Sequence, residues 1–236
     1  EIWQRVNPPY GTILDPDIIE SNFDTFEPEK FAHEHLGWFA ITEEEKIDTP
    51  IDADAWLAGI ADCPDFWMKQ GFGVYFDPTN GVVALSICVT QEDGSAHVEF
   101  YAQKPLSEGL TWLVDWLYAR VGKCVGIAID GRSGAIDLAE RLLAKGVDSK
   151  VVNVMGTGDA SAAVTMFCNA VADGDITHLD DKTLNSSAIE SPKRPIGKTG
   201  AYGFGGDNAA IVTSCSNAYW IARTSKYNPN RKMRLL

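Results

Sequence analysis

The sequence predicts an α/β protein built on a mixed sheet, in which a three-stranded antiparallel meander is followed by parallel strands, with helices on the flanks. Runs of β-branched and aromatic residues at 71–77, 82–90 and 96–102 are separated by the turn sequences PTNG and QEDG, which is the pattern of hairpins. After Pro105 helical and strand patterns alternate, and such alternation implies parallel strands joined by crossovers. The chain has 236 residues, 45% of them hydrophobic, which is enough for a sizeable core.

Further along the chain, helical periodicity and capping signals predict a series of helices, over residues 107–121, 133–145, 159–172, 180–190 and 207–223. Ser107 should cap the first of these helices, and Gly146 should end the second. Two strands are expected among them, an apolar one that ends at Asp130 and a short one within 149–155. The glycine-rich stretch RPIGKTGAYGFGG, residues 194–206, is expected to form a hairpin or a loop.

The first 65 residues differ in character from the rest of the chain. They are rich in acids and in turn sequences such as NPPYG, and residues 27–39 have hydrophobic side chains at helical spacing. We interpret residues 1–65 as an appended connector, 66–225 as the main domain and 226–236 as a basic C-terminal tail. Because the chain starts with Glu1 rather than methionine, we expect it to begin inside a longer protein.

The composition disfavours several classes of protein. A formal net charge of −13 opposes nonspecific adhesion to nucleic acid or to an anionic membrane, although it leaves room for a local basic face. The five cysteines are odd in number and scattered, and no pair has the short spacing of a zinc site, so we interpret them as reduced and structural. No secretory leader and no apolar run long enough to span a bilayer are present. We therefore expect a soluble intracellular protein that does not contact membranes.

Two acidic residues stand at the ends of predicted strands. Asp77 ends the first strand and Asp130 ends the fourth, and ligands gather at the carboxyl ends of strands in open α/β sheets. If the first strand lies centrally, these two carboxylates become neighbours. Asp207 stands at the start of the last helix, after a flexible glycine run that allows it to approach the same place. Each acid alone also fits a simpler role as a turn residue or a helix cap, but their joint placement favours a shared site.

Three converging carboxylates require a positive partner. Two unit charges about 4 Å apart repel each other by roughly 4 kcal/mol at an effective dielectric constant of about 20. Oxygen ligands favour a hard divalent cation such as Mg²⁺ or Mn²⁺, and two such ions can activate water and stabilise the leaving oxygen in phosphodiester hydrolysis. The sequence therefore predicts a two-ion site at Asp77, Asp130 and Asp207.

Several segments, taken in order, resemble the C-terminal nuclease domain of tailed-bacteriophage large terminases, which has an RNase H-like fold. They are YFDPTNGVVALSI, GIAIDGRSG, DGDITHL, SPKRPIG and GFGGDNAAIVTSCSNAYW. The resemblance implies an RNase H-like mixed sheet, metal-binding catalytic roles for Asp77, Asp130 and Asp207, and endonucleolytic cutting of concatemeric double-stranded viral DNA during packaging. It also implies four partners in the host cytoplasm: double-stranded DNA, the portal protein, the small terminase subunit and an ATPase domain of the same protein.

Basic residues and one histidine form a second group of candidates. Lys193, Arg194 and Lys198 lie in or beside the glycine-rich stretch, where they suit either contacts to DNA phosphates or a plain surface turn. Arg132 follows the acid of the fourth strand and suits pairing with that carboxylate, contact with DNA or plain surface exposure. His178 suits either a role beside the site or a DNA phosphate, or a place as a packed or surface residue.

Two other functions fit the same residues. A junction resolvase or a transposase-like nuclease would use the same fold and the same acids. A docking module that binds DNA or the portal without cutting would use basic surface and no metal. Cleavage of branched against linear DNA, together with binding of Mn²⁺, distinguishes the three functions.

Overall fold

The computed structural model describes residues 15–36, 48–131, 134–197 and 200–229. The chain divides into two compact units, Glu1–Ile47 and Asp48–Leu236. This division falls earlier than residue 65, where the sequence pattern changes. The reason is that Ile51 and Trp56, which are 2% and 1% exposed, belong to the hydrophobic core of the second unit.

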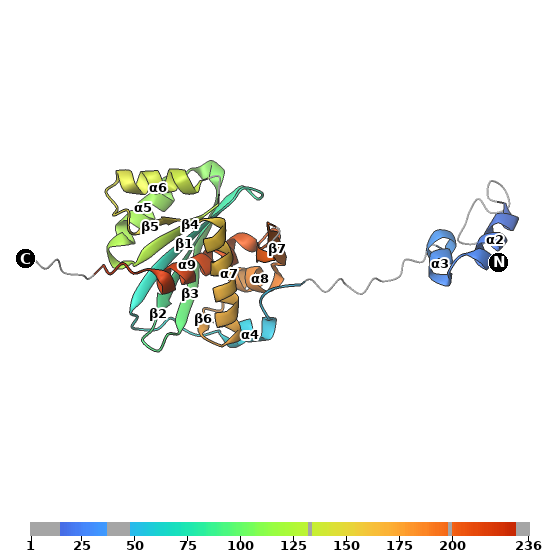
Figure 1. Ribbon diagram of the computed structural model, residues 1–236, viewed down its shortest axis with the longest axis horizontal. Coiled ribbons are helices and arrows are strands. Elements are labelled where there is room, and N and C mark those ends of the chain that lie inside the picture. The colour runs from blue at the N-terminus through green and yellow to red at the C-terminus, as the bar shows by residue number, and fades with distance from the viewer. Residues whose placement is uncertain (1–14, 37–47, 132–133, 198–199, 230–236) are drawn as a thin grey trace, which may run out of the picture. The chain divides into compact units, whose positions relative to one another are not determined.

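The described part of the first unit is a pair of short helices, α2 (Pro16–Thr25) and α3 (Pro28–Leu36) (Figure 1). The helices pack through an edge-to-face contact between Phe23 and Phe31, whose ring centroids lie 5.1 Å apart. Asp15 caps α2, because its side chain accepts a hydrogen bond from a backbone N–H in the first turn.

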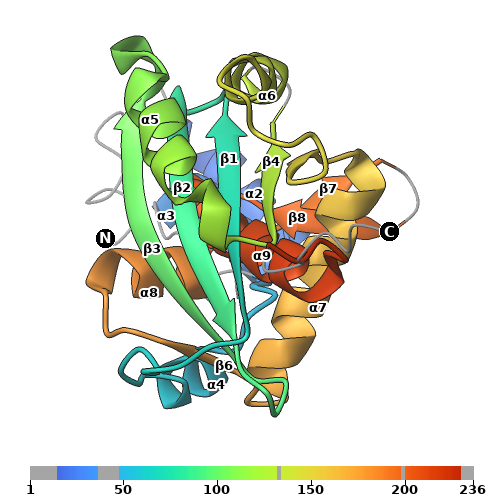
Figure 2. The same ribbon diagram turned by 90° about the vertical axis from the view of Figure 1, so that its left-hand side faces the viewer.

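A six-stranded mixed sheet forms the centre of the second unit, in the order β5-β4-β1-β2-β3-β6 (Figures 1 and 2). Its strands are β1 (Lys69–Asp77), β2 (Val82–Thr90), β3 (Ala96–Pro105), β4 (Gly126–Asp130), β5 (Val152–Val154) and β6 (Ile176–His178). The first three strands form the predicted antiparallel meander, and β4 and β5 continue the sheet in parallel beyond β1. β1 therefore lies in the interior of the sheet, which is the condition for Asp77 and Asp130 to be neighbours.

Helices lie on both faces of the sheet. They are α4 (Ala53–Ala58), α5 (Thr111–Arg120), α6 (Ala135–Ala144), α7 (Thr157–Ala172), α8 (Lys182–Glu190) and α9 (Ala209–Thr224). Side chains alternate between the two faces along β1, so Phe72 packs with Leu113 of α5 and Leu138 of α6 on one face. The other face carries a separate core in which Trp56 of α4 and Phe167 of α7 take part, together with residues of α8 and α9. The expected helices on the flanks of the mixed sheet are thus confirmed.

α9 lies directly against the backbone of β1. A Cβ atom added at Gly73 would lie 2.0 Å from the carbonyl oxygen of Ser214 and 2.3 Å from the backbone nitrogen of Ala218. Only glycine allows a strand and a helix to approach each other this closely. This contact fixes the distance between α9 and β1, and with it the position of the start of α9 near the carboxyl end of β1.

Several local features differ from the sequence prediction or resolve it. The prediction that Ser107 caps a helix is wrong, because Ser107 lies in a 3-10 turn and α5 begins four residues later, at Thr111. The residue before α5 is Leu110, which is buried and whose carbonyl oxygen accepts hydrogen bonds from the N–H groups of Leu113 and Val114. β6 was not expected, since three residues are too few to show an alternating pattern. The glycine-rich stretch is a hairpin of β7 (Lys193–Ile196) and β8 (Ala201–Phe204). In the described part of the chain, no helix combines the length and apolarity needed to cross a membrane.

Candidate functional site

Asp77 and Asp130 lie at the carboxyl ends of two neighbouring parallel strands. Tyr75 of β1 is paired with Asp130 of β4, and Asp77 follows Tyr75 by two residues. The three side chains therefore point to the same face of the sheet, the face that α9 covers. A rise of about 3.3 Å per residue and a strand spacing of about 4.8 Å place the two aspartate Cα atoms roughly 8 Å apart. Figure 2 shows β1 and β4 side by side with their arrowheads at the same end.

The turn after Asp130 depends on Gly131. This glycine has a φ of +104°, and a Cβ atom at its position would lie 2.3 Å from the carbonyl oxygen of Phe76. The Gly131 N–H donates a hydrogen bond to Asp130 Oδ1 at 2.7 Å. The glycine thus keeps the chain end of β4 close to β1 and holds one oxygen of the Asp130 carboxylate in place.

Asp77 is held by the turn that follows it. Its Oδ1 accepts hydrogen bonds from the backbone N–H groups of Thr79 at 2.9 Å and Asn80 at 3.2 Å, and its Oδ2 accepts one from the Asn80 side chain at 2.9 Å. The residue is only 6% exposed. The turn role that the sequence also allowed for Asp77 is therefore present, and it fixes the orientation of the carboxylate.

Asn80 connects this turn to the segment before α9. Its side-chain nitrogen also lies 3.1 Å from the carbonyl oxygen of Asp207, to which it donates a hydrogen bond. Asp77, Asn80 and Asp207 line one hollow of about 280 Å³, which Tyr75 and Arg194 also line. Asp207 is exposed and stands two residues before the first residue of α9, where the helix dipole favours negative charge.

The electrostatics of Tyr75 and Asp130 show that Arg194 lies near both. Burial raises the pKa of the Asp130 carboxyl, while the Gly131 N–H and Arg194 act in the opposite direction. Burial also raises the pKa of the Tyr75 hydroxyl, which Arg194 lowers and the charges of Asp77 and Asp130 raise. Arg194 is positioned by a hydrogen bond from its Nε to the carbonyl oxygen of Phe204 at 3.3 Å. Arg194 therefore lies close enough to act on both Asp130 and Tyr75.

Other predicted candidates lie elsewhere. His178 is fully buried on β6, three strands from β1, where its ring stacks on Trp56 at a centroid distance of 3.9 Å and both ring nitrogens lie 2.9 Å from backbone carbonyl oxygens. The packed role is the one that fits His178. Lys193 forms an ion pair with Asp48 at 2.9 Å, and its backbone N–H donates to the Asp48 carbonyl oxygen at 3.0 Å. Arg132 and Lys198 lie outside the described residues.

The donor set of the three aspartates suits a hard divalent cation. A carboxylate offers about four acceptor positions, and Asp77 uses three of them in its turn, whereas Asp130 accepts a hydrogen bond from the Gly131 N–H. The oxygen atoms of the three residues do not all lie within 4.8 Å of one another. Asp207 is the exposed member of the three, so its side chain is the one least constrained by packing.

Sequence analysis missed Tyr75 and Asn80. Tyr75 could have been predicted, because it precedes Asp77 by two residues in a strand and its side chain must point to the same face. Asn80 had only its place in a turn after an aspartate, which is common. Its bridge to Asp207 spans 127 positions in sequence, so the tertiary structure alone reveals it.

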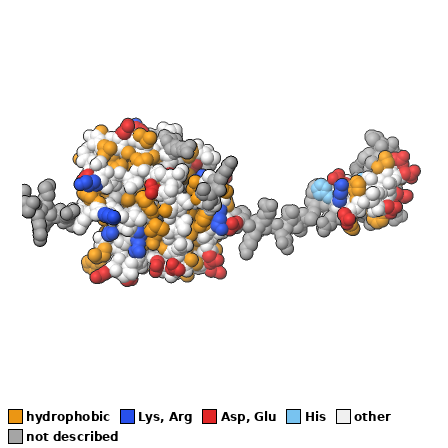
Figure 3. Space-filling view, viewed as in Figure 1, with side chains coloured by type: hydrophobic (Ala, Val, Ile, Leu, Met, Phe, Trp, Pro, Cys, Tyr) orange, Lys and Arg blue, Asp and Glu red, His pale blue; other side chains and the backbone are white. Residues whose placement is uncertain are grey.

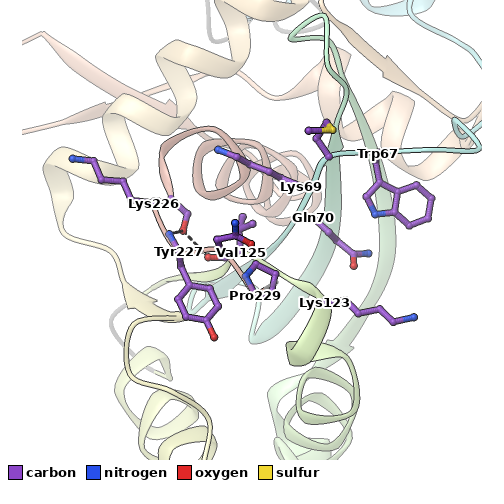
Figure 4. A pocket seen from close by; sticks show the side chains of 11 residues that line it. Trp67, Lys69, Gln70, Lys123, Val125, Lys226, Tyr227 and Pro229 are labelled. Atoms are coloured by element: carbon purple, nitrogen blue, oxygen red, sulfur yellow. Dashed lines mark hydrogen bonds between the residues drawn. The ribbon is translucent and has the colours of Figure 1, made fainter. Parts of the chain in front are cut away.

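A more spacious hollow lies away from these acids. It measures about 800 Å³ and lies at the amino ends of β1 and β4, where Lys69, Lys123, Lys226, Trp67 and Tyr227 help to line it. In Figure 4, Lys123 and Lys226 extend on opposite sides of this hollow. Figure 3 also shows basic side chains toward the left of one face of the second unit and acidic ones along its lower edge. Charge is therefore unevenly distributed over this face of the second unit.

Comparison with known proteins identifies the fold. No family model and no curated protein sequence matches the chain. Among solved structures, the large terminase of bacteriophage HK97 matches with a TM-score of 0.55 and 15% identity, over 92% of this chain and 53% of that one. The large terminase nuclease of thermophilic phage G20c matches with a TM-score of 0.51 and 16% identity, over 73% of this chain and 98% of that one. The large terminase of another thermophilic bacteriophage matches with a TM-score of 0.54 and 12% identity, over 91% of this chain and 52% of that one.

The chain has the fold of a phage large-terminase nuclease. The predicted RNase H-like mixed sheet is confirmed by this likeness and by the strand order. The chain spans about half the length of the large terminases that it matches from HK97 and from the second thermophilic phage. The terminase-nuclease fold places Asp77 and Asp130 at the end of the sheet where ligands of open α/β folds gather.

Proposed function

We propose that this chain is the nuclease part of a large terminase and is a metal-dependent endonuclease that cuts concatemeric double-stranded viral DNA during genome packaging. The observation that carries this proposal is the placement of Asp77 and Asp130 on one face, at the ends of two paired strands, with Asp207 in the same hollow as Asp77. The terminase-nuclease fold supports it. Fold alone does not assign a reaction, so the carboxylates are the decisive feature.

The three aspartates are the proposed ligands of Mg²⁺ or Mn²⁺, with two ions in the complete site. When bound, such ions supply an activated water and neutralise charge on the scissile phosphate. The turn amides and Asn80 orient Asp77 for this role. Arg194, which faces the acids from β7, is the proposed contact to a phosphate of the DNA backbone. The proposed partners are double-stranded DNA, the portal protein, the small terminase subunit and an ATPase domain of the same protein.

The experiment that tests the proposal is nicking of supercoiled plasmid in Mn²⁺ by the full chain, by Asp130→Asn and by Asp173→Asn. Asp173 is exposed at the end of α7 and serves as the matched control. Loss of a metal ligand removes several kcal/mol of transition-state stabilisation, so Asp130→Asn should cut at least about 100-fold more slowly. Asp173→Asn should cut at the rate of the unaltered chain. An unchanged nicking rate for Asp130→Asn would refute the assignment, provided that a chelator abolishes nicking by the unaltered chain in the same assay.

A docking module that binds DNA without cutting it is the second candidate function, and the lysine-lined hollow favours it. Lys69, Lys123 and Lys226 surround that hollow at the far end of the strands from Asp77, and lysines of this kind bind phosphates. Docking without cutting predicts no Mn²⁺ binding in calorimetry, no nicking, and DNA binding that a Lys69→Ala, Lys123→Ala double variant weakens. Preferential cleavage of branched over linear DNA would instead indicate a junction resolvase.

A further inference from the structure

A second cluster of metal-ligating side chains lies at the opposite end of the strands from Asp77. Cys63 belongs to the segment between α4 and β1, and His97 and Glu99 lie two residues apart on β3, so both point to the face that α5 covers. One ligand atom from each of the three residues lies within 4.8 Å of the others. Within the described ranges of the chain, no other group of three such residues meets this condition.

Among the three residues, His97 gives the strongest indication that the cluster binds a ligand. Its side chain is 1% exposed, and its Nδ1 lies 2.9 Å from the Thr177 hydroxyl oxygen. That hydroxyl donates its hydrogen to the carbonyl oxygen of Ala96 at 3.3 Å, so it accepts a hydrogen bond from Nδ1–H. In this tautomer Nε2 carries a lone pair. It is buried, it makes no hydrogen bond of normal geometry among the residues that the structure describes, and it lies 3.4 Å from Glu99 Oε1. A buried acceptor left in this condition costs free energy unless another group fills its lone pair.

We propose that Cys63, His97 and Glu99 bind a divalent ion of the zinc class, separate from the aspartate site. In tetrahedral zinc sites the metal lies about 2.0–2.2 Å from nitrogen and oxygen ligands, which puts those two atoms roughly 3.4 Å apart. His97 Nε2 and Glu99 Oε1 are 3.4 Å apart. Thiolate and imidazole ligands select zinc over magnesium or manganese, and the Thr177 hydroxyl supplies the outer hydrogen bond that fixes a ligating histidine.

The surroundings of Cys63 fit metal binding better than nucleophilic catalysis. Burial and the negative charge of Glu99 both raise the pKa of the Cys63 thiol, whereas catalytic cysteines have a lowered pKa. A cation reverses this effect, because the thiol then releases its proton to solvent and the thiolate sulfur bonds to the metal. The small hollow at the cluster, about 150 Å³, leaves the fourth position to water. The ion would tie the segment that enters β1 to the neighbouring surface of β3.

The test is titration of the chelator-treated full chain with Co²⁺, a spectroscopic substitute for zinc. We expect one equivalent to produce a cobalt–thiolate charge-transfer band, which Zn²⁺ displaces and Mg²⁺ does not. Cys63 is exposed, so Cys63→Ser should fold normally and lose the band completely. Cys168→Ser, which removes a buried cysteine elsewhere, and Asp130→Asn, which removes a ligand of the other site, should both keep it.

Two further variants test the geometry. Glu99→Gln should weaken Co²⁺ binding at least about 10-fold. Thr177→Val, which removes the hydroxyl that hydrogen-bonds to His97 and to the Ala96 carbonyl oxygen, should weaken it about 10- to 100-fold. Circular dichroism establishes that each variant is folded. Absence of a charge-transfer band at saturating Co²⁺ would overturn the proposal, as would a band that survives in Cys63→Ser. Neither result bears on nicking by the aspartates, which the same protein samples report separately.

Discussion

Gly73→Ala provides a quantitative check on the contact between β1 and α9. The added Cβ would lie 2.0 Å from Ser214 O and 2.3 Å from Ala218 N, and real Cβ atoms essentially never come closer than 3.0 Å to another heavy atom. Both neighbours are backbone atoms of a helix and cannot rotate away, so α9 has to retreat by about 1 Å. Overpacking of this kind costs about 1–3 kcal/mol and occasionally more, and we expect about 3 kcal/mol because two backbone atoms are in conflict.

The assay is scanning calorimetry of the full chain, in which the loss should lower the melting temperature of the second unit by about 6–12 °C. The retreat of α9 also displaces Asp207, and a misplacement of about 1 Å can slow a reaction by about 100-fold, so plasmid nicking should fall in the same variant. Gly122→Ala is the matched control, since nothing lies within 4 Å of the Cβ that it adds. A melting temperature for Gly73→Ala equal to that of Gly122→Ala would refute the close packing of β1 on α9.

Three other predictions concern Asp130, Asn80 and the start of the second unit. Asp130→Asn should be more stable than the unaltered chain at neutral pH without metal, because burial raises the pKa of Asp130 and so disfavours its charged form in the folded state. The difference should shrink as the pH falls through the raised pKa and vanish below pH 3.8, which thermal melts across this range will report. Asn80→Ala removes the bridge between the end of β1 and the start of α9; urea unfolding should show a loss of about 1–2 kcal/mol, and nicking should slow. A chain that begins at Asp48 should retain a cooperative calorimetric transition, whereas removal of residues 1–65 deletes Trp56 from the core and should abolish it.

The strand-end acids could be predicted because topology determines their relation. Once β1 is placed between an antiparallel partner and a parallel one, Asp77 and Asp130 have to meet at one end of the sheet, whatever the detailed packing. The pattern of β-branched residues and turns predicted the meander and the parallel strand after it, and the structure places that strand beside β1. The position of Asp207 depended on the glycine-rich hairpin before it, whose path the sequence left open.

Features held only by tertiary contacts escaped prediction. β6 has three residues, and it is stabilised by pairing with β3 and by the fully buried His178, which stacks on Trp56. Helix α4 has six residues and lies within a segment whose acidic composition suggested a connector. Cys63 and His97 have no recognisable spacing, because the register of β3 and the path of the chain before β1 bring them together.

The attachment of Asp48 to the β7–β8 hairpin has a mechanical consequence. Asp48 opens the second unit and is joined to Lys193 by an ion pair and a backbone hydrogen bond. Tension arriving along the chain at Asp48 is therefore shared between this attachment and the buried Ile51 and Trp56, which hold the next residues of the chain in the core. Asp77 and Asp130 are anchored in the central sheet, whereas Arg194 lies on the hairpin that carries part of this load, so tension would act on the distance between this arginine and the acids.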